Sequence, residues 1–450
     1  MFKKDFVWGA ATASFQIEGA AYEDGKGLSI WDTFCKEAGK VKEGHTGDIA
    51  CDHYHRVDED VRLMSELGLK AYRFSVSWPR IFPKGTGEVN QKGVDFYNHL
   101  IDKLLEYGIE PYMTMYHWDL PYELHKRGGW LNPEIADWFG AYAEVLVKNY
   151  SDRVKNFITL NEPQVFIGCG YLEGSHAPGY KLGSRDLLQM GINVLNAHGK
   201  AVEAIRKYAV QPAKIGVAMA TCPFVPQTES EADVKAAMMC YGNADRNNFV
   251  FTDAFWLDPM VFGKLPKGII DTCADILPEN AEKIAAGLKG SIDFIGENTY
   301  QANIIKADEN GFPTAGKLAV GHPRTSIDWA VYPDALYWGA KQAYERYKLP
   351  YIITESGMAA HDWVSLDGKV HDPNRIDYMH RYIKGLRRAA GEGVDVAGYF
   401  SWSFMDNFEW AKGYDERFGL VYVDYETQKR TPKDSAYWYK TVIESNGDNL

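Results

Sequence analysis

Two glutamates stand at the ends of short apolar segments and could divide the work of an acid–base reaction. Glu162 lies in the segment TLNEP and Glu355 in the segment ITESG. Proline biases the residue before it toward extended geometry, and a glycine ends the second segment just beyond Glu355, so we expect both side chains to project from strand ends. Two carboxyls at the mouth of one cavity can act as acid and as nucleophile or base, which is the chemistry of glycosidic bond hydrolysis.

Each glutamate taken alone is more often a salt-bridged structural acid than a reactive group. Arg73, from an earlier apolar segment, is available to keep one carboxyl ionised, and Asn161 is adjacent to the other. A nearby opposite charge favours the ionised form of a carboxyl, so the two glutamates can have different pKa values. Together the four residues make the functional interpretation the better one.

The segment SWSFMDNFEW at residues 401–410 combines aromatic rings with carboxylates and an amide. Sugars present flat C–H faces that pack on indole rings, and their hydroxyls bind amides and carboxylates. Other predicted strand ends carry the same kinds of residue, namely Gln16, Glu18, Arg73, Trp78, His117, Trp118, Asn161, Asn298 and Tyr300. This composition predicts a pocket for a neutral, hydroxylated ligand.

Other reaction chemistries have weaker support. No lysine stands at a strand end for a Schiff base, and no serine there has a partner histidine. His53 and His55 precede an amphipathic helix, where residues i and i+2 point apart, and His117 alone does not make a zinc site. A barrel phosphate site needs glycine-rich backbone, whereas Asp406 and Glu409 follow the last strand and would repel phosphate. We therefore expect no metal and no cofactor.

Eight β-rich segments alternate with helical periods along the whole chain. The predicted strands are 6–17, 71–78, 110–118, 155–162, 215–221, 293–300, 350–356 and 396–404. Amphipathic helices, with apolar residues at i, i+3, i+4 and i+7, are predicted at 57–67, 93–107, 133–150, 187–208, 333–347 and 374–391. Gly68 and Gly108 follow two of these periods and predict helix C-caps.

The alternation predicts an α/β fold in which eight parallel strands close into a (β/α)8 TIM barrel with long βα loops. A doubly wound open sheet is the alternative, but it usually has a G-x-G-x-x-G turn after its first strand, and QIEGA at residues 16–20 is not such a turn. A chain of 450 residues would allow about three domains. Because no linker interrupts the pattern, we expect residues 1–450 to form a single catalytic barrel domain.

The composition excludes several classes of partner. The chain has 61 acidic and 49 basic residues, a formal net charge of −12, which does not suit a surface for nucleic acid or an anionic membrane. No segment approaches the roughly 18 apolar residues of a membrane span, and the N-terminal sequence has no signal-peptide pattern. Six cysteines are scattered without metal-ligand spacing, which predicts buried reduced thiols. We therefore expect a cytoplasmic protein. Whether it forms a homo-oligomer is left open.

These motifs resemble the family 1 glycoside hydrolases, typically β-glucosidases, over essentially the whole chain. FVWGAATASFQIEG at residues 6–19 is similar to the N-terminal signature of that family. TLNEP is similar to its acid/base motif, ITESG to its nucleophile motif, and residues 402–410 to its late sugar-binding loop. Several long motifs in the right order make the resemblance specific.

The resemblance implies a retaining β-glucosidase without a cofactor, in which Glu355 attacks the anomeric carbon and Glu162 serves first as acid and then as base. The expected substrates carry a terminal non-reducing β-D-glucosyl residue: cellobiose, short cello-oligosaccharides, and aryl or alkyl β-glucosides. This substrate range implies a role in carbohydrate metabolism and cellulose degradation.

The resemblance also implies roles for the surrounding residues. Arg73 and Tyr300 would keep Glu355 charged, with Asn298 in support, while Glu162 would have the higher pKa. Trp402 would be the stacking platform for the sugar, and Trp329 would lie on the aglycone side at the cavity entrance. The hydroxyls of the glycone would be held by Gln16, His117, Trp118, Asn161, Glu409 and Trp410, with Asn161 at the 2-hydroxyl.

Three residues depart from the usual pattern of the family. Ser356 replaces the common asparagine after the nucleophile, Asp328 replaces a glycine before the entrance tryptophan, and Gln164 stands where some relatives have tryptophan. We expect the last two to lie toward the leaving-group side, where they would alter aglycone preference.

Two other functions are compatible with the same fold. A 6-phospho-β-glucosidase would have a Ser/Lys/Tyr phosphate cluster after the last strand, where this chain has EWAKGY at residues 409–414, and Glu409 would repel a phosphate. A non-catalytic sugar-binding homologue would typically lack one of the two glutamates, and both are present. Gln16 and Glu409 can bind either C4 epimer, so the choice between gluco-, galacto- and fuco-preference stays open.

Overall fold

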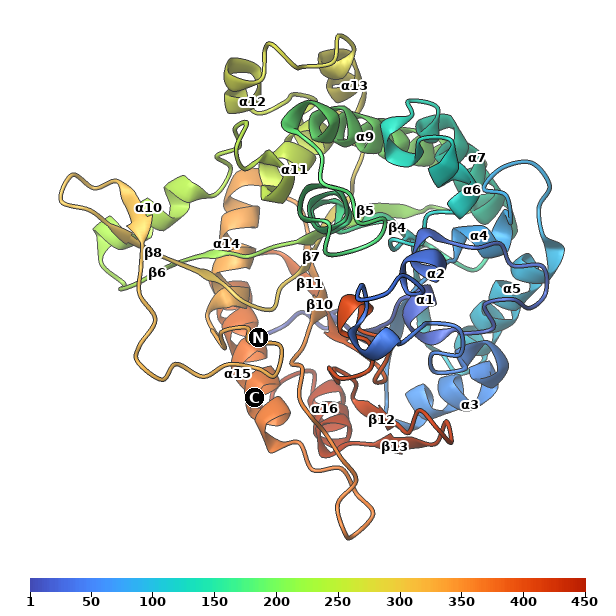
Figure 1. Cartoon of the computed structure of the whole chain (residues 1–450). Coiled ribbons are helices and arrows are strands. Elements are labelled where there is room, and N and C mark those ends of the chain that lie inside the picture. The colour runs from blue at the N-terminus through green and yellow to red at the C-terminus, as the bar shows by residue number, and fades with distance from the viewer.

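A closed barrel of parallel strands forms the centre of the molecule in the computed structural model, which describes residues 1–450 (Figure 1). Its strands are β1 (Val7–Ala11), β2 (Ala71–Ser75), β3 (Glu110–Tyr116), β4 (Asn156–Asn161), β5 (Lys214–Ala220), β7 (Phe294–Asn298), β10 (Tyr351–Ser356) and β11 (Val396–Trp402). β1 pairs with both β2 and β11, so the sheet closes on itself. The predicted (β/α)8 barrel is confirmed and the open sheet is excluded.

The first predicted strand, 6–17, is wrong in its C-terminal part. β1 ends at Ala11, which pairs with Arg73, and helix α1 (Ser14–Ile17) follows. The backbone N–H of Ser14 donates to the Ser75 hydroxyl at 2.7 Å, a contact that turns the chain away from the sheet. On the other side of β1, strand β11 ends at Trp402, the partner of Ala11.

All six predicted amphipathic helices are present. They are α3 (His53–Glu66), α5 (Gln91–Glu106), α7 (Ile135–Tyr150), α9 (Ser184–Tyr208), α14 (Ala335–Tyr347) and α15 (Pro373–Gly391), and they surround the barrel (Figure 1). Gly68 and Gly108 have φ angles of 78° and 69° after α3 and α5, as expected for helix C-caps. No helix combines the length and the apolar composition that a membrane span requires.

Helix α11 (Asp253–Phe262) was not predicted, because its apolar residues do not fall on one face. Eight of its ten residues are buried, and a helix of this kind has no amphipathic period to detect. The other helices outside the prediction are α2 (Ile30–Phe34), α4 (Trp78–Ile81), α6 (Tyr122–Lys126), α8 (Pro163–Ile167), α10 (Glu231–Cys240), α12 (Lys267–Thr272), α13 (Ala281–Gly287) and α16 (Asp434–Glu444).

Five short strands lie in the loops outside the barrel. β6 (Phe224–Pro226), β8 (Asn303–Ala307) and β9 (Pro313–Ala315) form a three-stranded sheet, and β12 (Val421–Val423) and β13 (Arg430–Pro432) form an antiparallel pair. These segments belong to the long connections after the barrel strands, so the extra length of the chain is in its βα loops.

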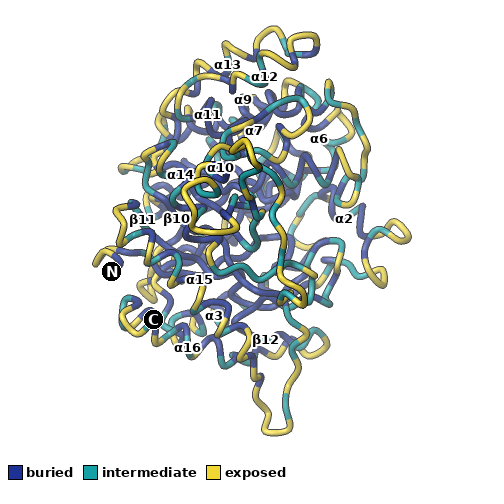
Figure 2. Tube along the Cα trace, turned by 90° about the vertical axis from the view of Figure 1, so that its left-hand side faces the viewer, coloured by how far each residue is buried: buried dark blue, intermediate teal, exposed yellow.

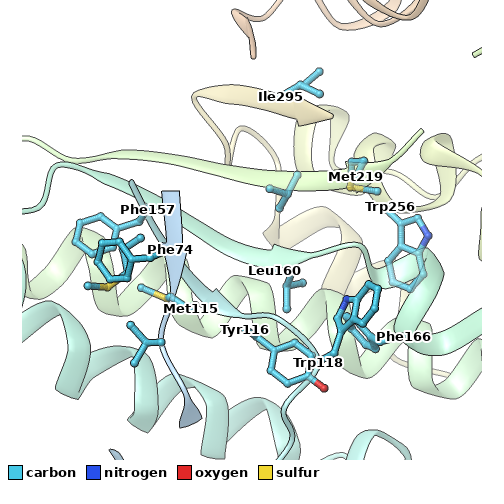
Figure 3. Packing of buried hydrophobic residues seen from close by; sticks show 14 of the residues in the cluster. Phe74, Met115, Tyr116, Trp118, Phe157, Leu160, Phe166, Met219, Trp256 and Ile295 are labelled. Atoms are coloured by element: carbon cyan, nitrogen blue, oxygen red, sulfur yellow. The ribbon is translucent and has the colours of Figure 1, made fainter. Parts of the chain in front are cut away.

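The hydrophobic core has two parts, one on each face of the barrel wall. The larger cluster packs the outward-facing side chains of the strands against the helices, and Figure 3 shows Phe74, Met115 and Phe157 among them. The smaller cluster fills the barrel interior with residues such as Ile158, Ile352 and Phe400. Figure 2 shows that exposed residues are concentrated in the peripheral loops. The strands therefore form a rigid support for the side chains at their ends.

A buried network of ion pairs joins the loops that follow β10 and β11. The ammonium group of Lys433 is 2.6 Å from Asp362 and 2.7 Å from Asp406, and all three side chains are buried. Arg375, which is 1% exposed, also pairs with Asp362, at 2.7 Å. Each buried charge thus has a partner of opposite sign, as stability requires.

Replacing Lys433 by methionine tests this network. The variant leaves Asp362 and Asp406 without their shared cation, so we expect the free energy of unfolding to fall by about 3–5 kcal/mol in chemical denaturation. Lys3→Met is the matched control, because Lys3 pairs with Asp395 on the surface, where the lysine side chain is 59% exposed. We expect almost no change in the control, and an equally small change in Lys433→Met would contradict this account.

Candidate active site

A pocket of about 440 Å³ opens at the C-terminal ends of the barrel strands. This is the end of a (β/α)8 barrel at which loops from all strands converge. Ten of the residues predicted for the site line it: His117, Trp118, Glu162, Asn298, Tyr300, Trp329, Glu355, Trp402, Glu409 and Trp410. Arg73, Asn161 and Gln16 do not line the pocket but lie directly behind residues that do.

Arg73 is a buried charge that connects four strands. Its side chain is 1% exposed, and its guanidinium donates to Glu355 Oε1 at 2.6 Å and to Asn161 Oδ1 at 2.5 Å. Two further donor bonds reach the hydroxyl of Thr114 at 3.0 Å and the carbonyl of Thr354 at 3.1 Å. The acceptors come from β3, β4 and β10, so the register of the barrel sets the position of this charge.

Glu355 lies in surroundings that support its ionised form. Besides the bond from Arg73, its Oε2 accepts a hydrogen bond from the Tyr300 hydroxyl at 2.7 Å. Burial raises the pKa of Glu355 above its ordinary value, and the charge of Arg73 and the bond from Tyr300 reduce this increase. These two contacts stabilise the carboxylate against the cost of burial.

Glu162 lies in surroundings that favour its protonated form. Its Oε1 accepts one hydrogen bond, from the Asn298 side chain at 2.8 Å. Burial, followed by the negative charge of Glu355, raises the pKa of Glu162 to about 8. A carboxyl with this pKa is largely protonated at neutral pH.

The backbone of Glu162 is left-handed and not extended, so that expectation was wrong. Its φ and ψ are 49° and 64°, and Pro163 begins helix α8 immediately afterwards. Proline disfavours the right-handed helical region for the residue before it, but it leaves the left-handed region accessible. The backbone N–H of Glu162 donates to the Ala218 carbonyl of β5 at 2.7 Å, which holds this conformation.

The strands lose their regular register next to both glutamates. The pairing of β4 with β5 shifts between Ile158 and Asn161, and the pairing of β10 with β7 shifts between Ile353 and Glu355. Such irregularities turn the following side chains, and they are common beside active sites. The two carboxyls are thereby directed into the pocket.

Two buried polar atoms at the closed end of the pocket have no protein partner. The Gln16 side chain donates to the carbonyl of Phe408 at 2.9 Å, but its Oε1 is unpaired. His117 contacts Asn161 through Nε2 at 3.0 Å, and its Nδ1 is unpaired. Buried polar atoms are almost always hydrogen-bonded in proteins, so these two are suited to bind ligand hydroxyls.

Glu409 adds a third carboxyl to this end of the pocket. Burial raises its pKa to about 8, with further contributions from the charges of Glu355 and Glu416. Its Oε2 is 3.5 Å from the Gln16 amide nitrogen. The neighbouring negative charges make this region unfavourable for an anionic ligand.

The aromatic residues form a continuous wall. Trp118 and Trp410 have ring centroids 4.5 Å apart, and Trp402 stacks on His117 at 5.9 Å. The indole N–H of Trp118 donates to the Asn161 carbonyl at 3.0 Å, so Trp118 can offer its ring but not its N–H to a ligand. At the entrance, Trp329 lies against Tyr300 with centroids 5.1 Å apart.

The residues that depart from the family pattern are placed differently from one another. Asp328, before Trp329, has a φ of 67°, a conformation for which glycine is the ordinary choice and which aspartate tolerates. Gln164 does not line the pocket: it is 1% exposed, and its amide donates to Asp253 at 2.9 Å. The hydroxyl of Ser356 is buried and has no partner.

The sequence analysis missed the residues that line the entrance, including His176, Cys169, Cys222, Thr221 and Phe418. They come from long loops, and neither their types nor their spacing marked them. All six cysteines are free, but Cys169, Cys222 and Cys240 are only partly buried, so the expectation of six buried thiols was wrong.

His53 and His55 lie apart from this pocket. His53 is buried with its Nδ1 2.7 Å from Asp60, while His55 is exposed and contacts Asp52 and Glu23. The two imidazoles therefore point apart, as their spacing on a helix predicted. No group of three metal-ligating side chains occurs in the structure.

The strand ends of this (β/α)8 barrel present two carboxyls with different hydrogen-bond donors, in a pocket walled by indole rings. This is the arrangement of a glycoside hydrolase. The family model for glycosyl hydrolase family 1 matches residues 1–448. The chain belongs to this family.

Similar proteins align with this chain over almost their full lengths. β-Glucosidase A of Thermotoga maritima is 48% identical over 99% of this chain and 98% of its own. A structure of β-glucosidase from Thermotoga maritima in complex with glucoimidazole superposes with a TM-score of 0.90 and 47% identity, covering 99% of each chain. Aryl-phospho-β-D-glucosidase BglC of Bacillus subtilis is 42% identical over 100% of this chain and 98% of its own.

The coupling between the two carboxyls can be measured by titration. Because the charge of Glu355 raises the pKa of Glu162, we expect Glu355→Gln to lower that pKa from about 8. The carboxyl carbon of Glu162 can be followed against pH by ¹³C NMR. Glu409→Gln is the comparison variant, for which we expect a smaller decrease, since Glu409 contributes less than Glu355. An unchanged pKa in Glu355→Gln would contradict the coupling.

Proposed function

We propose that this protein is a retaining β-glucosidase in which Glu355 is the nucleophile and Glu162 the acid/base. Protonated Glu162 donates its proton to the glycosidic oxygen while ionised Glu355 attacks the anomeric carbon, so the aglycone leaves and a glycosyl-enzyme ester forms. Glu162, now ionised, takes a proton from water as the water attacks the same carbon. Glu355 leaves as a carboxylate, and β-glucose is released with Glu162 protonated again.

The opposite surroundings of the two carboxyls carry this proposal. The reaction needs one ionised and one protonated carboxyl at its start, and both are buried in one pocket. Of the two carboxyls, only that of Glu355 accepts hydrogen bonds from Arg73 and Tyr300. Glu162 has a single amide donor, and its pKa is raised to about 8. The roles are assigned by these contacts and not by the sequence motif alone.

The proposed substrates carry a terminal non-reducing β-D-glucosyl residue, as in cellobiose, short cello-oligosaccharides, and aryl or alkyl β-glucosides. The free atoms of Gln16 and His117, together with Asn161, Glu409 and the Trp410 indole, would bind the hydroxyls of the sugar. Trp402 would pack on the face of the ring, and Trp329 would contact the aglycone at the entrance. The name of the Thermotoga maritima relative, β-glucosidase A, supports the choice of glucosides.

We also propose that residues 1–450 act as one catalytic domain, because the barrel strands extend from Val7 to Trp402 with helix α16 packed after them. A cytoplasmic role in the breakdown of cellulose-derived oligosaccharides is supported by the six free thiols, which suit a reducing compartment.

A 6-phospho-β-glucosidase is the second candidate, because the Bacillus subtilis relative is named an aryl-phospho-β-D-glucosidase. Glu409 lines the pocket, and burial, followed by the negative charge of Glu355, raises its pKa to about 8. A phosphate in this pocket would add further negative charge to a region where carboxyls are already difficult to ionise. The glucosidase is therefore the function that the site supports better.

The stereochemistry of the product tests the mechanism. Proton NMR during hydrolysis of an aryl β-glucoside should show β-glucose first, because two inversions at the anomeric carbon restore its configuration. Initial α-glucose would rule out a glycosyl-enzyme on Glu355. Glu355→Gln should nearly abolish turnover, whereas Glu18→Gln, at a buried glutamate 3.0 Å from Arg80 and outside the pocket, should retain it.

The substrate class has its own test. We expect kcat/KM for 4-nitrophenyl β-glucoside to exceed that for its 6-phosphate, because a phosphate would add negative charge to a pocket that already holds the carboxyls of Glu355 and Glu409. The two substrates can be compared in one colorimetric assay with the same leaving group. A preference for the 6-phosphate would overturn the proposed substrate class while leaving the family assignment intact.

A further inference from the structure

A buried polar cluster lies behind Glu162, outside the pocket. Gln164, two residues after Glu162, is 1% exposed, and Asp253, the first residue of α11, is 8% exposed. The Gln164 amide nitrogen donates to Asp253 Oδ1 at 2.9 Å, and the Thr221 hydroxyl donates to Asp253 Oδ2 at 3.2 Å. Neither Gln164 nor Asp253 lines the pocket, so the proposed reaction does not use them directly.

Gln164 connects the turn at Glu162 to the end of strand β5. While its nitrogen is bonded to Asp253, its Oε1 accepts a hydrogen bond from the backbone N–H of Ala220 at 3.3 Å. The backbone N–H of Glu162 is itself bonded to Ala218, two residues earlier in β5. The turn that carries Glu162 is therefore tied to β5 at two places.

This turn needs such support because its backbone is unfavourable for glutamate. The φ of 49° at Glu162 lies in the left-handed region, which residues with a Cβ rarely occupy. Such conformations persist where surrounding contacts over-determine them. One of the two ties depends on the side chain of Gln164 and thus on the group that orients its amide.

Asp253 is the group that orients this amide. Asp253 accepts from the amide nitrogen of Gln164, so the amide oxygen is directed at the N–H of Ala220. If the amide were turned over, neither of its ends would be bonded. Asp253 is itself held by packing, because Trp256 one turn later belongs to the buried cluster that contains Met219 of β5 and Phe166 of α8 (Figure 3). Its other oxygen fixes Thr221, which does line the pocket.

We infer that Asp253 is a positioning residue for Glu162: through Gln164 it holds the left-handed turn that aims the acid/base carboxyl at the leaving-group oxygen. This inference rests on the proposed role of Glu162. The alternative is that Asp253 only stabilises the start of α11, where an acidic residue is favourable in any helix.

The two interpretations differ in how they depend on the leaving group. An alkyl β-glucoside needs its glycosidic oxygen protonated, whereas 2,4-dinitrophenolate leaves without protonation. Because kcat/KM reports the first, bond-breaking step, a misplaced acid lowers it for the alkyl substrate and spares the dinitrophenyl substrate. A loss of stability alone lowers the amount of folded enzyme and changes both values by the same factor.

The experiment compares kcat/KM for octyl and 2,4-dinitrophenyl β-glucoside in a set of variants of the full chain. Asp253→Ala removes both acceptor oxygens, and Asp253→Asn keeps one oxygen for the Gln164 amide. Asp60→Asn is the matched control, because Asp60 is a buried acid bonded to His53 and Arg430, none of which lines the pocket. Glu162→Gln is included as the reference for a lost acid.

For Asp253→Ala we expect the ratio of octyl to dinitrophenyl kcat/KM to fall on the order of 10-fold or more, since small misplacements of a reactive group have effects of this size. We expect Asp253→Asn to keep most of the original ratio and Asp60→Asn to keep all of it. An unchanged ratio in Asp253→Ala would overturn the inference, as would an Asp253→Asn variant as impaired as Asp253→Ala.

Glu162→Gln separates this inference from the function on which it rests. If Glu162→Gln lowers the ratio and Asp253→Ala does not, the acid/base assignment stands and the positioning role of Asp253 is wrong. If Glu162→Gln leaves the ratio unchanged, the acid/base assignment itself fails.

Discussion

The buried guanidinium of Arg73 is the interaction on which the site depends. A charge removed from water is costly unless all of its donors are bonded, and here the acceptors come from three other strands. The register that closes the barrel is therefore also the register that satisfies Arg73. Because one of its acceptors is Glu355, closure of the barrel and ionisation of that carboxyl are parts of the same arrangement.

The strand ends next to Arg73 are irregular, and their irregular backbone gives the pocket its shape. Trp118, Glu162 and Trp410 all have positive φ angles, each of which costs about 1–3 kcal/mol. The packing of the strands against the surrounding helices offsets this cost, since the outer core is continuous around the barrel. A rigid scaffold thus supports local strain at the positions where side chains must converge.

Overall similarity does not determine the substrate within this family. The chain is 48% identical to a relative named as a β-glucosidase and 42% identical to one named as an aryl-phospho-β-D-glucosidase. A shared fold therefore does not fix the substrate. In this chain the pocket holds the carboxyl of Glu409, whose pKa is raised to about 8 by burial and then by the charges of Glu355 and Glu416.

The sequence by itself determined the eight strands, the main amphipathic helices and the residue types of the site, because hydrophobic periods and short motifs are local properties of the chain. It failed where distant segments decide a local conformation. The end of β1 and the left-handed backbone of Glu162 depend on Ser75 and Ala218, which lie far away in the sequence.

Helix α11 and several pocket-lining residues were missed for a related reason, since burial on every side and loop position leave no periodic signal. The family resemblance predicted different surroundings for the two glutamates, but only the tertiary structure shows which donors reach each of them. That distinction arises from Arg73 and Tyr300, which reach Glu355 and not Glu162, and a pKa depends on such neighbours and not on the identity of the residue.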